Sequence, residues 1–192
     1  MKNMVFHPGQ LYHVYNRGNN QQLIFFTRDN YLFFLEKVRK YLLPHSEILA
    51  YSLMPNHILF LLETRADLKL NGLNLSIGTL PSSYTQAISI RQNRAGSLFQ
   101  QHANARCLEI SDEHYPLTCF HYIHQNPYVT RLTERMEDWE FSSFKDYLGL
   151  RNGTLCNQPR ARQLLDLPTD REAFYRQAYQ TIPSGRVRKI VW

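Results

Sequence analysis

The sequence predicts an α+β domain in which helices lie mainly on one face of an antiparallel sheet. Three observations predict it. Segments of strand and helix periodicity follow one another in the order strand, helix, strand, strand, helix, strand, helix. Apolar residues make up 43% of the 192 residues, which is enough for a sizeable core. Charged residues make up only 20%, which argues against wholesale disorder.

The chain begins with a predicted strand and helix. Residues 10–17 alternate in the manner of a strand, and Gly18-Asn19-Asn20 breaks it. Residues 27–43 carry apolar side chains at helical spacing. Thr27 can cap this helix and Pro44 stops it.

A β-hairpin and a second helix are expected next. Strands at 47–53 and 57–63 flank the turn Pro55-Asn56, so they can pair as an antiparallel hairpin. Residues 65–78 contain two glycines and two asparagines, which favours irregular structure. A helix is predicted from about 82 to 93.

The next part of the chain predicts a weaker strand at 103–110 and a third helix. The run Ser111-Asp112-Glu113 opens this helix, because acidic residues complement its positive N-terminal end. The helix continues to about Gln125, and Asn126-Pro127 closes it, since the residue before proline avoids helical geometry. Residues 139–150 form a small aromatic segment.

A shift to polar composition at Arg151 divides the chain into a domain at 1–150 and a C-terminal helical and basic extension at 151–192. The capping-box pattern from Thr169 to Glu172 predicts a helix to about Gln180. Residues 185–189 predict a basic, mobile tail.

The net charge of +6 and the isoelectric point near 9.3 favour a polyanionic partner. The 12 Tyr and 11 Phe residues can stack on unpaired bases, although most of these rings are expected in the core. Three scattered cysteines without CxxC spacing argue against a zinc ribbon and a disulfide framework. No signal peptide and no 18-residue apolar run are recognisable, so we expect a cytoplasmic protein with no membrane partner.

Tyr122 and Asn126 lie four residues apart on the third predicted helix and therefore share a face, whereas His121 and His124 lie on another. A tyrosine hydroxyl has a pKa near 10, so attack on phosphorus benefits from a cation that polarises the phosphate. The carbonyl oxygen of Asn126 is a ligand for a hard divalent ion. The alternative is a half-buried core tyrosine and a helix-capping asparagine.

His57 begins an apolar strand on which alternate residues share a face. Two imidazoles at i and i+2 would hold a divalent metal, but Leu59 occupies the second position. Glu63 lies on the same face but roughly 13 Å beyond Leu59 by the rise of a strand, so it is a poor substitute. His13 can contribute only if the first strand pairs beside His57. The alternative is a structural histidine bonded to the turn.

Five stretches together resemble the HUH-type single-tyrosine transposases, and most closely the branch associated with repetitive extragenic palindromes. They occur in family order over roughly residues 9–148. They are Tyr12-His-Val-Tyr-Asn-Arg-Gly18, Ala50-Tyr-Ser-Leu-Met-Pro-Asn-His57, Asn93-Arg-Ala-Gly-Ser-Leu-Phe-Gln100, Tyr122-Ile-His-Gln-Asn-Pro127 and Trp139-Glu-Phe-Ser-Ser-Phe144.

The resemblance implies a ferredoxin-like sheet that carries the metal-binding strand. It implies Tyr122 as the nucleophile on a catalytic helix, and His57 and Asn126 as ligands of magnesium or manganese. Members of this family cleave and rejoin single-stranded DNA near hairpins through a 5′-phosphotyrosine link. Two positions depart from the family pattern. Leu59 replaces the second histidine, and His102-Ala103-Asn104 replaces an arginine-aromatic-lysine run.

These observations predict a DNA transposase-like enzyme, active as a monomer or homodimer on single-stranded or hairpin DNA. The alternative is a domesticated, catalytically impaired DNA-binding protein, because of Leu59. An RNA-binding domain ranks third, since no RNP-like run is found. Arg17, Arg91 and Arg94 are candidate phosphate contacts, or else solvated surface arginines. His102 is a further candidate DNA contact and, like His13, a candidate source of the missing nitrogen.

Overall fold

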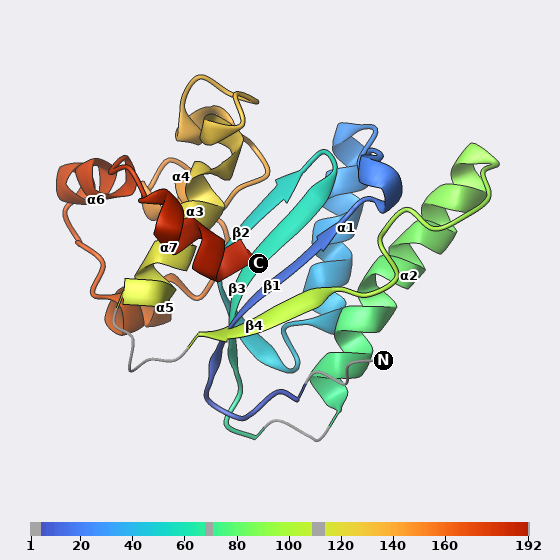
Figure 1. Ribbon diagram of the computed structural model, residues 1–192, viewed down its shortest axis with the longest axis horizontal. Helices are drawn as coiled ribbons and strands as arrows, with labels where there is room; N and C mark the ends of the chain where they lie inside the picture. The colour runs from blue at the N-terminus through green and yellow to red at the C-terminus, as the bar shows by residue number, and fades with distance from the viewer. Residues whose placement is uncertain (1–4, 68–70, 109–113, 192) are drawn as a thin grey trace.

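The computed structural model describes residues 5–67, 71–108 and 114–191 (Figure 1). A four-stranded antiparallel sheet in the order β2-β3-β1-β4 forms its centre. The strands are β1 (Leu11–Arg17), β2 (Ser46–Met54), β3 (His57–Thr64) and β4 (Asn104–Leu108). The helices are α1 (Arg28–Tyr41), α2 (Gly72–Gln92), α3 (His114–Val129), α4 (Phe144–Tyr147), α5 (Gln158–Leu165), α6 (Arg171–Ala178) and α7 (Ser184–Val191), with short 3-10 helices η1 (Asn19–Gln21) and η2 (Met136–Asp138).

Apart from the short helix η1, the chain begins with β1, α1, β2, β3, α2 and β4, and their order and strand arrangement are those of a ferredoxin-like domain. The predicted α+β fold class is therefore confirmed. α1 and α2 cover one face of the sheet, as expected (Figure 1). The other face is covered as well, by α3 and the helices that follow it, so the expectation of helices mainly on one face holds only for the ferredoxin-like part.

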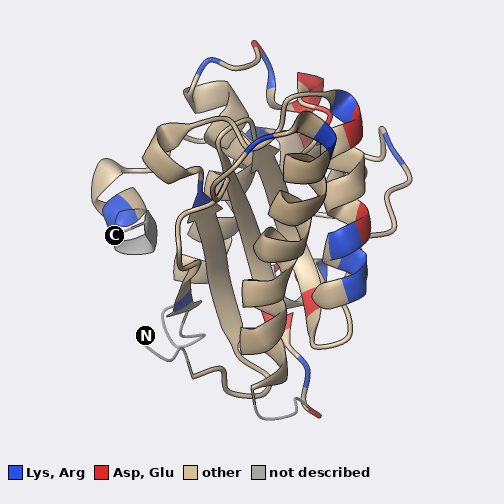
Figure 2. Ribbon diagram, turned by 90° about the vertical axis from the view of Figure 1, so that its right-hand side faces the viewer, with Lys and Arg blue, Asp and Glu red and all other residues tan. Residues whose placement is uncertain are grey.

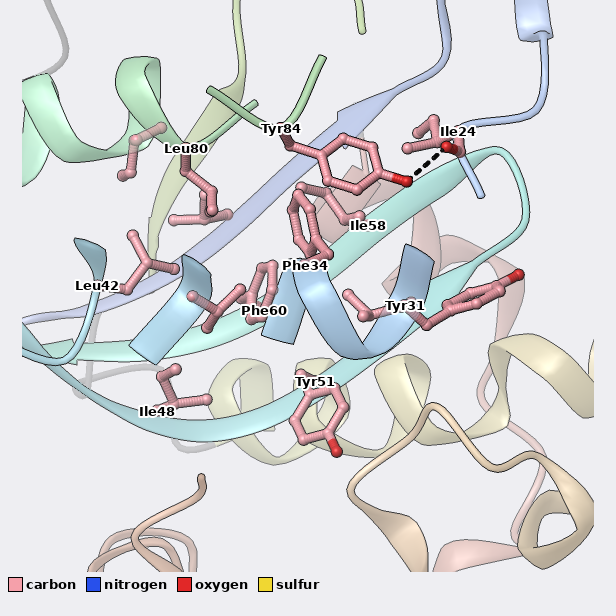
Figure 3. Close-up of a cluster of buried hydrophobic side chains, with 14 of the residues drawn as sticks. Ile24, Tyr31, Phe34, Leu42, Ile48, Tyr51, Ile58, Phe60, Leu80 and Tyr84 are labelled. Carbon is pink, nitrogen blue, oxygen red and sulfur yellow. Dashed lines mark hydrogen bonds between the residues drawn. The ribbon is translucent and has the colours of Figure 1, made fainter. Parts of the chain in front are cut away.

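Aromatic side chains fill the core between the sheet and the α1–α2 layer (Figure 3). Phe34 of α1 and Tyr84 of α2 are both fully buried, with ring centroids 5.1 Å apart in an edge-to-face arrangement. The hydroxyl of Tyr84 donates to the carbonyl of Ile24 at 2.9 Å, so its polar end is satisfied although it is buried. This layer packs against the face of the sheet opposite the one that α3 covers.

The second face packs against α3, which lies across β2 and β3. The C-terminal helices complete this layer. Arg160 of α5 donates two hydrogen bonds to the carboxylate of Glu63, at 2.6 and 2.8 Å. The amide of Gln125 on α3 donates to the carbonyls of Ala178 and Gln180 at the end of α6. The residues after 150 therefore pack directly on the ferredoxin-like part.

α2 begins ten residues before the predicted start at 82, so the expectation of irregular structure over 65–78 is wrong for residues 72–78. Leu73, Ile77 and Leu80 are buried at helical spacing on the sheet side of this segment. Burial of these side chains outweighs the weak helix propensity of the glycines and asparagines around them.

α3 does not end at Asn126-Pro127 as predicted but continues to Val129. Pro127 lies in the last turn, where its missing N–H costs a single backbone hydrogen bond. The carbonyl of Asn126 accepts from the backbone N–H and the hydroxyl of Thr130, at 3.0 and 2.7 Å, which closes the helix further on. Asn126 is thus a helical residue rather than a cap. The predicted opening at Ser111 lies outside the described residues.

The C-terminal region contains more helix than expected. α5 was not predicted, although Asn157 caps it by accepting from the backbone N–H of Arg160 at 3.1 Å. The predicted helix at 169–180 is observed as α6, with Asp170 rather than Thr169 as its cap. Residues 185–189, expected as a mobile tail, lie within α7, whose Val187 packs against the core beneath α3. Within the described residues, no helix is both long and apolar enough to cross a bilayer.

Candidate active site

The turn between β2 and β3 that carries His57 is anchored by backbone hydrogen bonds from a neighbouring loop. The N–H of Gly18 donates to the carbonyl of Asn56 at 2.7 Å, and Ile24 donates to the carbonyl of Pro55 at 2.7 Å. A Cβ atom on Gly18 would overlap the carbonyl oxygen of Gln22, so only glycine permits this close approach. The loop after β1 therefore fixes the turn at the base of the site.

His57 is held from both sides by amide side chains. Its Nδ1 lies 2.8 Å from Oδ1 of Asn56, and its Nε2 lies 3.1 Å from Oδ1 of Asn126. Burial lowers the pKa of His57 to about 4, so the ring is neutral at neutral pH and carries one N–H. A ring with one N–H can donate to only one of these two amide oxygens. In the tautomer that donates from Nδ1 to Asn56, the Nε2 lone pair is free to bind a metal.

Tyr122 is half-buried and lies one helical turn before Asn126 on α3. Burial raises the pKa of its hydroxyl above 10, while the nearby cation of Arg17 and a hydrogen bond with the amide of Asn126 partly offset that effect. The phenol is therefore neutral at neutral pH and must lose its proton to act as a nucleophile. Asn126 interacts with Tyr122 and lies 3.1 Å from His57, so the three side chains lie together.

The same two side chains line one small pocket between the sheet and α3. Its lining also includes Arg17, Leu59 and Tyr15, with His13 and Asn16 of the same strand. Arg17 lies directly opposite His57, and Tyr15 opposite Leu59, in the register of β1 and β3. The free volume is about 10 Å³, room for about one water molecule. A bound phosphate must therefore displace side chains at the rim of this pocket.

The donor pair of His57 and Asn126 fits a small divalent ion. Ligands at adjacent corners of an octahedron with bonds of about 2.1 Å lie about 3.0 Å apart. The two donor atoms are 3.1 Å apart. A carbonyl oxygen and an imidazole nitrogen are accepted ligands of magnesium and manganese. The described residues contain no group of three or more His, Cys, Asp or Glu side chains arranged for a metal.

Leu59 is 4% exposed and packs in the core beneath α3, yet it lines the same pocket as His57. It supplies no lone pair to a metal. Of the two histidines considered as substitutes, His13 lines this pocket, and its ring lies edge-on to Tyr122 with centroids 6.1 Å apart. His102 is exposed and lines a different cavity.

The candidate phosphate contacts separate into two places. Arg17 is half-buried and lines the pocket with Tyr122. Arg91 is exposed at the end of α2, and Arg94 follows it and donates to the side chain of Gln22 at 2.9 Å. The structure thus brings Tyr122, His57, Asn126 and Arg17 together, and places Arg91, Arg94 and His102 elsewhere.

Two residues of this site escaped sequence reasoning. Asn56 holds the histidine ring, and Tyr15 provides a second phenol beside Leu59. Asn56 was interpreted only as a turn residue. Its position immediately before a histidine was the available signal. The place of Tyr15 depends on the pairing of β1 with β3, which alternation within one strand cannot reveal.

Comparison with known proteins identifies the fold. A solved structure of a REP-associated tyrosine transposase bound to a REP hairpin matches with a TM-score of 0.56, over 78% of this chain and 84% of that chain, at 16% sequence identity. The chain has the fold of a REP-associated tyrosine transposase. The resemblance inferred from the sequence is therefore confirmed at the level of the fold.

A bacterial tRNA(His) guanylyltransferase-like protein in complex with ATP also matches, over 85% of this chain and 70% of that chain. Its TM-score is 0.39 at 14% identity, which is too low for inference. No model of a protein family and no curated protein matches the sequence.

Proposed function

We propose that this protein is a transposase-like enzyme that binds single-stranded or hairpin DNA and cleaves and rejoins it through Tyr122. The proposal is carried by the placement of Tyr122 and His57 in one pocket, with Asn126 of α3 beside both side chains. The fold neighbour bound to a REP hairpin supports DNA as the partner. The net charge of +6 agrees with a polyanionic substrate.

In the proposed reaction, the hydroxyl oxygen of Tyr122 attacks a backbone phosphorus. A new bond forms between that oxygen and phosphorus, and the bond from phosphorus to the 3′ oxygen breaks. The phenolic proton is transferred, by way of solvent, to the departing 3′ oxygen. The products are a 5′-phosphotyrosine link and a free 3′ hydroxyl. Attack by a 3′ hydroxyl on the link reverses these steps and rejoins the strand, so the cycle needs no external energy source.

Each residue around the pocket has a defined part in this proposal. Arg17 places a cation beside both Tyr122 and His57, which favours a bound phosphate and the phenolate. Asn126 orients the phenol, and Asn56 fixes the tautomer of His57.

His57 and Asn126 would hold a magnesium or manganese ion. Such an ion polarises the phosphate and neutralises charge that develops on it.

A second candidate function is favoured by one observation. Leu59 leaves His57 and Asn126 as the two adjacent ligands, so metal affinity and turnover are lower than with a second imidazole. On this alternative, the protein is a descendant that binds hairpin DNA without cleaving it. The two functions differ in a single measurable product, the covalent link between DNA and protein.

The test incubates the protein with a panel of single-stranded hairpin DNAs and manganese, and separates the products on denaturing gels. The enzyme proposal predicts an adduct with the native chain and none with Tyr122→Phe. Tyr128→Phe is the matched control, because Tyr128 lies on the same helix, is 42% exposed and lines another cavity. DNA binding without any adduct would favour the second candidate. Equal adduct from Tyr122→Phe would exclude Tyr122 as the nucleophile.

A further inference from the structure

The outermost strand of the sheet, β4, is open along one edge. The strands lie in the order β2-β3-β1-β4, so β4 pairs with β1 on one side, and no strand of the described residues lies beyond it. In an outermost strand, alternate backbone N–H and C=O groups point away from the neighbouring strand and can pair with a further one. β4 therefore offers a place at which the sheet can be extended.

The opposite edge of the sheet is covered by the chain itself. The N–H of Leu53 on β2 donates to the carbonyl of Phe141 at 2.9 Å, and the carbonyl of Tyr51 accepts from the N–H of Ser143 at 3.0 Å. The indole of Trp139 donates to the carbonyl of Leu53 at 3.1 Å. Backbone groups on the outer edge of β2 are thus already bonded, so β4 is the edge at which the sheet can grow.

The helix beside this open edge, α2, has almost no charge. A groove of about 1110 Å³ lies between α2 and the segment 96–103, which leads into β4. Among the described residues that line it, none is Lys, Arg, Asp or Glu, and Leu75 on its wall is 70% exposed. The single charged residue of α2 is Arg91 in its last turn, whereas α1 has six among its 14 residues. Figure 2 shows this contrast, with α2 facing the viewer.

This composition is typical of a surface that contacts protein. A helix that faces water carries charged side chains on its outer side, whereas charged residues are depleted at the centre of protein interfaces. Nucleic acid is not the partner that this surface fits, because phosphate contacts depend on Lys and Arg. The open edge of β4 and the uncharged side of α2 together therefore fit a protein partner that adds a strand.

The two faces of β4 differ in their surroundings. Asn104 and Arg106 are exposed and share a face with Leu108, which packs in the core beneath α3. Ala105 lies on the other face and packs against the core beneath α1 and α2. Two copies of one strand pair antiparallel about a twofold axis perpendicular to the sheet, so side chains on the same face lie opposite each other.

Charge selects one register for such a pair. A pairing centred on Ala105 places Asn104 of each copy opposite Arg106 of the other, where the amide oxygen can accept from the guanidinium group. A pairing centred on Arg106 would instead set two guanidinium groups directly opposite each other, and like charges in that position are destabilising. β4 thus has one register in which it complements itself.

We propose that this protein forms a dimer in which β4 pairs antiparallel with β4 of a second copy, centred on Ala105, and the uncharged side of α2 completes the interface. The two four-stranded sheets then form one sheet of eight strands. Because the axis is perpendicular to the sheet, both Tyr122 pockets lie on the same face of the joined sheet. The proposal is independent of the proposed function, since no residue of β4 or α2 lines the Tyr122 pocket.

The test measures self-association of the full chain without DNA, by sedimentation velocity from about 1 to 100 µM. We expect the native chain to show a monomer–dimer equilibrium. Asn104→Arg places like charges opposite each other twice in the dimer, so the dissociation constant should rise about tenfold. Asn104→Glu creates two ion pairs with Arg106 and should lower the dissociation constant about tenfold. Asn104→Arg combined with Arg106→Glu reverses the pair and should restore the dimer.

Asn104 and Arg106 are exposed, so these changes leave the core intact. Asn152→Arg is the matched control, because Asn152 is exposed in the loop between α4 and α5, away from β4 and α2 in the sequence. A native chain that stays monomeric over the whole concentration range would overturn the proposal. A dimer that is as tight in Asn104→Arg as in Asn152→Arg would also overturn it, because the contact would then lie elsewhere. Neither result bears on the role of Tyr122.

Discussion

Replacement of Leu59 by histidine tests the account of the metal site most sharply. The side chain is 4% exposed, packs beneath α3 and lines the pocket with His57. Removal of a buried leucine from the core costs about 2–3 kcal/mol, so the metal-free variant Leu59→His should be less stable by that amount. An imidazole two residues from His57 on the same strand face would add a nitrogen ligand to His57 and Asn126.

The gain in metal affinity should recover much of this loss. An added ligand that tightens manganese binding about tenfold is worth about 1.4 kcal/mol. Manganese at one hundred times its dissociation constant stabilises the folded state by about 2.7 kcal/mol. Denaturant unfolding with chelator and with manganese measures the difference, and calorimetry measures the dissociation constant. At equal manganese concentration, the stabilisation should be larger in Leu59→His than in the native chain.

The matched control is the same variant with His57→Ala, which keeps the new imidazole and removes its partner. In this control the manganese effect should disappear. If Leu59→His folds but manganese stabilises it no more than it stabilises the native chain, the proposed place of the metal is refuted.

Two further predictions concern histidines. Asn56→Ala removes the acceptor for Nδ1 of His57, so nitrogen NMR should show the ring changing towards the other tautomer, and manganese should bind about 10–100-fold more weakly. Asn56→Asp should preserve the tautomer and the manganese affinity. An unchanged ring spectrum in Asn56→Ala would contradict the role of Asn56. Burial lowers the pKa of His57 and of His121 to about 4, so the unfolded chain binds protons below about pH 6.5 and the folded chain does not. The contribution of these histidines to stability should therefore be fully present above pH 6.5 and be lost from there towards pH 4, so stability should fall over that range, less steeply in His121→Phe. A flat profile between pH 6.5 and 5 would be inconsistent with this reasoning.

The fold was largely predictable, because burial on each face of each element leaves a periodic pattern. β1, α1, β2 and β3 lie within one or two residues of their predicted bounds. The start of α2 was not predictable from local preferences, since Gly72, Asn74 and Gly78 favour turns while Leu73 and Ile77 are buried by the sheet. α7 was likewise not predictable from local preferences, because it is stabilised by the packing of Val187 against the core beneath α3.

The features of the candidate site that lie within a single helix or strand could be predicted from the sequence. The shared face of Tyr122 and Asn126 follows from helix periodicity, and a histidine on the β3 turn is evident in the sequence. Contacts between elements needed the structure. The distance from His57 to Asn126, the register of Arg17 opposite His57, and the presence of Tyr15 in the pocket all depend on strand order and on the position of α3.

The most direct test of the central claim is to identify the residue that becomes linked to DNA. Tyr122 and Tyr15 line the same pocket, so either phenol is a conceivable nucleophile by position alone. Mass spectrometry of the digested protein–DNA adduct distinguishes them. The account predicts a nucleotide attached to Tyr122, in the group with Asn126 and His57. Attachment to Tyr15 or to any other residue would contradict it.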